Sequence, residues 1–120
     1  MTEHYKTEQE IAAVVDGFEN CTTSKEEFTH LSHLTVATYY LRNATPDEAL
    51  EKMRSGLFRF LDHHAVGQGK YKEQLTRAWL NLVREVVELV EQANPEASLV
   101  EVTNMVLDRL GDSRIVAAAE

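Results

Sequence analysis

The chain has 120 residues, a length that fits one domain with a single hydrophobic core. Hydrophobic residues make up 43% of the chain and charged residues 27%, a balance typical of soluble globular proteins and not of disordered ones. Asp and Glu outnumber Lys and Arg by 20 to 12, and the resulting net charge of −8 argues against nucleic acid or an anionic membrane as the main partner, because binding to phosphates requires clustered cations.

The N-terminal segment is polar and does not have the pattern of a signal peptide, which combines a positively charged stretch with an apolar run. No window approaches the roughly 18 apolar residues of a membrane span. These features predict a cytoplasmic protein without a membrane partner, and the acidic balance is common in bacterial cytosolic proteins. We expect residues 1–8 to fray and a first helix to form around residues 11–18. Cys21 is the single cysteine, so it cannot form an internal disulfide, and we expect an inert thiol.

The second predicted helix spans residues 25–42. Ser24 and Glu27 have the spacing of a capping box, which favours a helix start at this point. On a helical wheel, Glu27 and His30 point in the same direction as the apolar residues, and His33 lies at the edge of that arc. Because a buried carboxylate is costly without a partner, the pattern predicts that something faces Glu27 inside the bundle.

The third predicted helix begins at Thr45-Pro46-Asp47-Glu48, where Thr45 has the position of an N-cap and Pro46 that of the first helical residue. It ends near His64, before the glycine turn at residues 67–69. Residues spaced by three or four positions predict its buried stripe: Leu50, Met53, Leu57 and Leu61.

A fourth helix is predicted over residues 70–92, where the Asn94-Pro95 pair closes it. A fifth begins after Ser98 and ends at Gly111, a plausible C-cap. The tail, residues 113–120, forms either a short helix or a frayed end. Because no alternating strand pattern occurs, the sequence predicts an all-α fold in which residues 1–120 form a single domain, an irregular bundle of about five helices.

The histidines of the second helix suggest a polar site inside this bundle. Two histidines at positions i and i+3 can bind one metal ion, but such a site needs further ligands from another helix. His64 is the best candidate because it shares the face of the third helix's stripe, whereas His63 points away. The predicted metal- or ligand-binding residues are therefore Glu27, His30, His33 and His64, with Tyr71 at the edge of the pocket.

The predicted ligand is a divalent metal (zinc, iron or manganese) or a small polar molecule. If the site were catalytic, Glu27 or a histidine would act as general base on a metal-bound water. A purely structural interpretation is open too. Glu27 could serve only as a capping residue, the imidazoles could donate to neighbouring carbonyls, and His63-His64 could be a solvated helix end.

A second functional interpretation is a non-enzymatic interaction module. Val83 and Val87 lie off the main apolar stripe of the fourth helix, where they could meet a second subunit of a homodimer. The last two long helices would then form the interface.

Three blocks within residues 27–80 resemble a family of small bacterial proteins of uncharacterised function. They read E-F-T-H-x-x-H-L-x-V-A-x-Y-Y-L, A-L-x-x-x-R-x-G-L-x-R-F and G-x-Y-x-E-x-L-T-x-x-W-L. In that family the first block reads roughly W/F-T-H-x-x-H-L and the third G-Y-H-E-T-L-T-x-x-W. The resemblance implies an all-helical protein but no particular reaction.

If that family has a metal centre, the resemblance implies three ligands: His30, His33 and position 72. Position 72 is Lys72 here, and a lysine is a poor metal ligand. Three alternatives follow: His64 or Glu73 replaces the lost ligand, the metal is no longer bound, or Lys72 forms a buried ion pair with Glu27.

Overall fold

A computed structural model describes residues 4–67, 69 and 71–111 of the chain. Across those residues the secondary structure is entirely helical, which confirms the predicted all-α class. The helices are α1 (Glu8–Glu19), α2 (His30–Asn43), α3 (Pro46–His63), α4 (Glu73–Ala93) and α5 (Leu99–Leu110).

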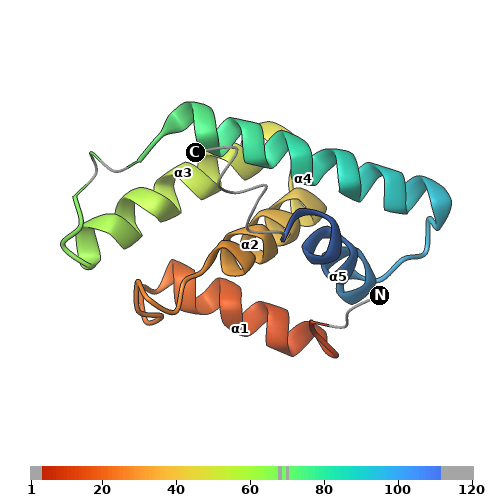
Figure 1. Cartoon of the computed structure of the whole chain (residues 1–120), viewed down its shortest axis with the longest axis horizontal. Coiled ribbons are helices and arrows are strands. Elements are labelled where there is room, and N and C mark those ends of the chain that lie inside the picture. Colours follow the sequence, from red (N-terminus) through yellow and green to blue (C-terminus); the bar gives the residue numbers. More distant parts are fainter. Residues whose placement is uncertain (1–3, 68, 70, 112–120) are drawn as a thin grey trace.

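Helix α2 lies at the centre of the bundle and contacts the other four helices, with α1 and α4 on opposite sides of it (Figure 1). Buried residues accordingly go all the way round this helix, including Val36 and the threonines Thr35 and Thr38. The buried hydroxyls of these threonines donate to the carbonyls of Leu31 and Leu34, at 2.8 Å each. These bonds satisfy the polar groups, so threonine can occupy the core.

Capping boxes start most of the helices. They are centred on the N-cap residues Thr7 for α1, Thr29 for α2, Thr45 for α3 and Ser98 for α5. Helix α4 differs from these four because its N-cap, Lys72, makes no side-chain capping bond. Each box satisfies backbone N–H groups that the first turn leaves without a partner, and such caps typically contribute about 1 kcal/mol.

Helix α2 begins at His30, five residues later than the sequence predicts. The Ser24 hydroxyl does accept from the Glu27 backbone N–H, at 3.1 Å, and donates to the Glu27 carboxylate at 2.9 Å. These bonds close a single turn, after which a second capping box at Thr29 starts the helix proper. Phe28 lies between the two boxes, and its buried ring fixes the chain at this point.

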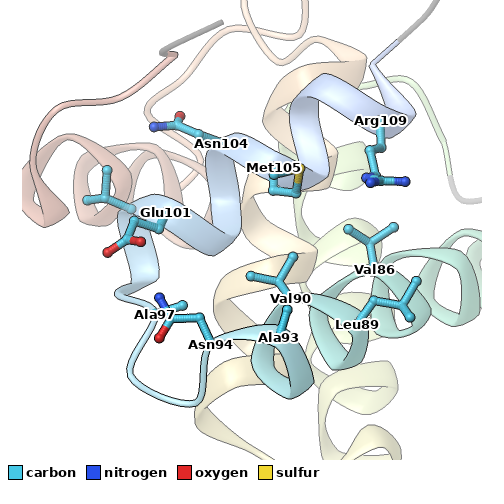
Figure 2. Close-up of a pocket in the computed structure, with 11 residues that line it drawn as sticks. Val86, Leu89, Val90, Ala93, Asn94, Ala97, Glu101, Asn104, Met105 and Arg109 are labelled. Carbon is cyan, nitrogen blue, oxygen red and sulfur yellow. The ribbon is translucent and has the colours of Figure 1, made fainter. Parts of the chain in front are cut away.

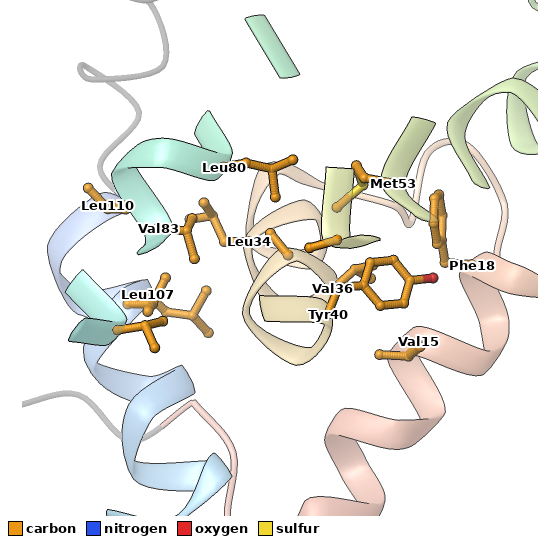
Figure 3. Packing of buried hydrophobic residues seen from close by; sticks show 14 of the residues in the cluster. Val15, Phe18, Leu34, Val36, Tyr40, Met53, Leu80, Val83, Leu107 and Leu110 are labelled. Atoms are coloured by element: carbon orange, nitrogen blue, oxygen red, sulfur yellow. The ribbon is translucent and has the colours of Figure 1, made fainter. Parts of the chain in front are cut away.

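Three phenylalanine rings fill the part of the core between α1, the turn before α2, and α3. Phe28 stacks on Phe18 with ring centres 4.8 Å apart and lies 5.0 Å from Phe60. Figure 3 shows that the core extends across both sides of α2, with Phe18 on the α1 side and Val83 and Leu107 on the side of α4 and α5.

The buried face of α3 is rotated from the predicted stripe. Its buried residues are Ala49, Met53, Gly56 and Phe60, whereas Leu50, Leu57 and Leu61 are only half-buried. The cause is Gly56: a Cβ atom there would lie 2.5 Å from the Phe18 ring. The missing side chain lets α1 and α3 approach each other closely.

The first described residues are bonded to α5 instead of forming a free end. The Asn104 side-chain carbonyl accepts from the backbone N–H groups of His4, at 3.1 Å, and Tyr5, at 2.9 Å. Its amide group donates to the Tyr5 carbonyl, at 2.9 Å. Residues 1–3 and the tail at 113–120, for which the sequence predicts fraying or a short helix, lie outside the described residues.

Candidate functional site

A cavity of about 320 Å³ lies between α2, α3 and α4. We call it the α2–α4 pocket. Among the described residues its wall contains no Asp, Glu, Lys or Arg side chain, and its polar groups come from two imidazoles, one threonine and the indole N–H of Trp79. The lining residues are His30, His33, Leu34, Ala37, Met53, Leu57, Leu75, Thr76, Trp79, Leu80 and Val83.

His30 is the first residue of α2 and is held in one orientation by α5. Its Nε2–H donates to the carbonyl of Leu110, the last residue of α5, at 3.1 Å. Because a carbonyl can only accept, this bond places the proton on Nε2 and leaves Nδ1 of a neutral ring as an acceptor. The ring also meets the indole of Trp79 edge-on, with centres 4.8 Å apart.

His33 lies one turn further along α2, with its ring perpendicular to that of Phe28 and the centres 4.5 Å apart. Desolvation by the surrounding protein, followed by the neighbouring His30, lowers the pKa of His33 below its usual 6.5. The residue as a whole is nonetheless exposed to water, which limits that desolvation. Both influences on the pKa act downward, so the imidazole is neutral at pH 7.

The opposite walls of the pocket come from α3 and α4. Met53 and Leu57 contribute from α3, and Thr76 and Trp79 from α4. Neither Thr76 nor Trp79 is among the site residues predicted from the sequence. Both belong to the L-T-x-x-W-L block, and their spacing of three places them on one helix face, a signal that could have identified them.

Glu27 does not reach this pocket. It belongs to the turn that precedes α2, its side chain is exposed, and its carboxylate bonds Ser24. The prediction that Glu27 points into the bundle is therefore wrong, because the wheel that places it beside His30 assumes a helix that has not yet begun. Lys72 is also exposed, and no ion pair joins these two described residues, so the predicted Lys72–Glu27 pair does not form.

His64 also lies apart from the pocket, at the C-terminal cap of α3. Its ring packs against Phe60, with centres 4.4 Å apart, and against His63 at 5.0 Å. The His64 Nε2 atom is buried and has no hydrogen-bond partner among the described residues. His63 is exposed, as its predicted outward direction requires.

Glu73 is engaged by cations and cannot readily replace a missing metal ligand. Its carboxylate accepts from Arg54 at 2.6 and 3.0 Å, from Arg77 at 2.7 Å and from the Tyr71 hydroxyl at 2.8 Å. Arg54 is the main cause of its low pKa of about 2, and Tyr71 and Arg77 lower it further. The predicted pocket edge is thus a separate network between α3 and α4.

Within the described residues, no group of three or more His, Cys, Asp or Glu side chains is placed to hold a metal ion. Of the four predicted site residues, His30 and His33 share the α2–α4 pocket, and Glu27 and His64 lie elsewhere. Two imidazoles are fewer than the three or four protein ligands that metal centres usually have.

The exposed apolar residues of α4 differ from those that the sequence predicts. Val83 and Val87, predicted to face a second subunit, are 0% and 4% exposed and belong to the core. Leu82 and Leu89 are the exposed ones, at 38% and 60%. The apolar stripe of α4 is therefore wide. The bundle covers the edge that carries Val83 and Val87, and the edge that carries Leu82 and Leu89 is exposed.

Comparisons of the chain with protein-family models, curated proteins and solved structures found no match. The resemblance to a family of small bacterial proteins stays a prediction. None of the described helices has the length and apolar character that crossing a membrane requires. The fold and site together define an all-α bundle with a mainly apolar pocket.

Proposed function

We propose that this protein binds a small, uncharged and largely apolar molecule in the α2–α4 pocket. The composition of the wall carries this proposal: aliphatic side chains and one indole surround two imidazoles and one hydroxyl, with no Asp, Glu, Lys or Arg among the described lining residues. Sites for small molecules typically combine an apolar wall with a few polar groups that fix orientation. At about 320 Å³ the pocket suits a ligand at the small end of the usual range of roughly 300–1,000 Å³.

The polar groups restrict the chemistry of the ligand. Because Nε2 of His30 donates to Leu110, Nδ1 of the neutral ring is an acceptor, and this form favours a ligand O–H or N–H group. Neutral His33 offers one further donor and one acceptor. A carboxylate or an ammonium group would lose its hydration without meeting an opposite charge. We therefore expect a phenol, alcohol or amide to bind in preference to an acid or an amine.

The sequence predicts a divalent metal or a small polar molecule instead, and the metal has less support. The pocket would offer it only His30 and His33, and the Nε2 atom of His30 is already engaged by Leu110. The homodimer predicted from the sequence cannot form through Val83 and Val87, because both are buried, and sedimentation tests whether another surface of α4 and α5 joins two copies.

Trp79 makes the ligand proposal directly testable. It is the only tryptophan of the chain and lines the pocket, so its fluorescence reports occupancy. Phenol, benzoate and benzylammonium share an aromatic ring and differ in charge, and each can be titrated at pH 7. We expect phenol to change the emission saturably with a Kd of roughly millimolar order, as suits so small a ligand. Benzoate and benzylammonium should bind at least about tenfold more weakly, since neither charge finds a partner.

Substitutions test whether the change in Trp79 emission arises from binding in the α2–α4 pocket. Ala37→Leu extends a buried side chain into the pocket, so it should abolish the phenol response, and His33→Leu should weaken it. The matched control is His63→Leu, which removes an exposed imidazole outside the pocket and should change nothing. Equal responses to phenol and benzoate, or an unchanged response in Ala37→Leu, would contradict the proposal. A stoichiometric response to Zn²⁺ that His33→Leu removes would instead assign the site to a metal.

A further inference from the structure

A second apolar hollow, of about 620 Å³, lies between α4 and α5. We call it the α4–α5 groove. Figure 2 shows Val86, Leu89 and Val90 of α4 on one side of it and Met105 and Arg109 of α5 on the other. It belongs to a different pair of helices from the α2–α4 pocket, and the two share no lining residue.

The α4 side of the groove is an apolar helix face that is buried at Val86 and exposed at Leu89 and Ala93. Val86, Leu89, Val90 and Ala93 line it at the three- and four-residue spacing of one face, over about two turns. Leu89 is 60% exposed, the highest value for any large hydrophobic side chain in the described part of the chain. An apolar strip that continues from a groove onto an exposed leucine is typical of a surface that binds a partner.

The charges around the groove are mainly negative. Glu85 and Glu88 are exposed beside Leu89, and Glu101 is exposed on the α5 side. Arg109 is the one Lys or Arg side chain among the described residues that line the groove. The whole chain also carries a net charge of −8. A partner that complements this surface needs an apolar face flanked by positive charges.

We propose that the α4–α5 groove binds an amphipathic helix from another protein, with apolar residues every three or four positions and Lys or Arg on its flanks. An apolar helix face laid into a groove between helices is a common mode of peptide recognition. Electrostatic complementarity would speed the encounter and select this partner against acidic helices. A second copy of the chain fits less well, because it would bring the same carboxylates and another net charge of −8 to the interface.

Two synthetic peptides with the same leucine face, one flanked by lysines and one by glutamates, test this inference. Binding is followed by the fluorescence anisotropy of the labelled peptide. We expect the lysine peptide to bind at least about tenfold more tightly than the glutamate peptide, with a difference that narrows as salt is added. Equal binding of both peptides would overturn the charge argument.

Two leucine variants locate the binding surface. Leu89→Ser should weaken binding of the lysine peptide at least about tenfold, and it should leave the fold intact because the side chain is largely exposed. Leu82→Ser is the matched control, since Leu82 is exposed on the same helix but does not line the groove. Equal effects of the two variants would overturn the assignment to the groove.

Charge reversal at the edge of the groove provides an independent test of the proposal. The double variant Glu85→Lys, Glu88→Lys should lose the preference for the lysine peptide and gain affinity for the glutamate peptide. The one ion pair it breaks, Arg84 with Glu88, is long, at 4.0 Å, and lies at the surface, so little stability should be lost. An unchanged preference would contradict the proposed complementarity.

Two other occupants of the groove are outcomes of the same experiments. Self-association in sedimentation that Leu89→Ser removes would assign the groove to a second copy and overturn the proposal. Displacement of the lysine peptide by a synthetic peptide of residues 112–120 would assign the groove to the chain's own C-terminal segment and would also overturn the proposal. The Trp79 response to phenol should be unaffected by Leu89→Ser, because the two sites are separate.

Discussion

The substitution Gly56→Ala tests how closely α1 and α3 pack. In a helix interior this change ordinarily stabilises a protein by about 1 kcal/mol, because alanine has the higher helix propensity. Here the new Cβ would lie 2.5 and 2.7 Å from two atoms of the Phe18 ring, whereas ordinary contacts begin at 3.4 Å. The ring cannot move aside easily, since it is fully buried and stacked on Phe28.

Overpacking of this kind costs about 1–3 kcal/mol, and disturbing an aromatic stack costs about 0.5–1.5 kcal/mol more. After the propensity gain of about 1 kcal/mol is subtracted, we expect Gly56→Ala to lower the free energy of unfolding by about 0.5–3.5 kcal/mol. Urea denaturation followed by circular dichroism measures it, with the m-value as a check on the denatured state. Gly69→Ala is the control, because a Cβ there meets nothing within 4 Å. A Gly56→Ala variant as stable as wild type, or more so, would refute the account of the packing.

Three further substitutions test other contacts. Asn104→Ala removes three hydrogen bonds to the backbone of residues 4 and 5, so urea denaturation should show that the free energy of unfolding falls by about 2–3 kcal/mol. A decrease below about 0.5 kcal/mol would show that Asn104 does not hold the N-terminal segment. His33 has a lower pKa in the folded than in the unfolded chain, so the unfolded chain binds more protons below pH 6.5 and the free energy of unfolding of the wild type decreases as the pH falls. His33→Gln should make this dependence of stability on pH shallower. An unchanged dependence would count against a desolvated imidazole. Glu73 has a folded pKa of about 2 against 4.5 unfolded, so its ionised contacts stabilise the fold fully above pH 4.5 and are lost as the pH falls through 2. The stability difference between wild type and Glu73→Gln should therefore narrow across that window, and a constant difference would show that the carboxylate's charge contributes nothing.

Much of the fold follows from local sequence signals. The Thr45 and Ser98 caps place the starts of α3 and α5 at the predicted residues, because the cap bonds lie within four consecutive residues. The start of α2 is not predicted, because Ser24 with Glu27 fits the sequence pattern of a capping box, whereas Thr29 is followed three residues later by a serine. The choice between them depends on the burial of Phe28 against rings from two other helices, a contact distant in sequence.

The candidate site is predictable only in part for the same reason. His30 and His33 belong to one helix, so their shared direction can be read from a wheel, and both line the pocket. The other walls depend on how α3 and α4 rotate against α2, which Gly56 and Phe18 help to set. His64 lies at the end of α3, where a small error in helix direction moves a side chain out of reach of the pocket.

The central claim, that the α2–α4 pocket binds a small neutral ligand, is tested most directly by nuclear Overhauser effects between phenol and the protein. The chain has three methionines, of which Met53 lines the α2–α4 pocket and Met105 lines the α4–α5 groove. Labelled methionine methyl groups therefore report the two sites separately. We predict effects from phenol to the Met53 methyl and the Trp79 indole and none to the Met105 methyl. Effects confined to Met105, or none to Met53 at concentrations of phenol that change the Trp79 emission, would contradict the claim.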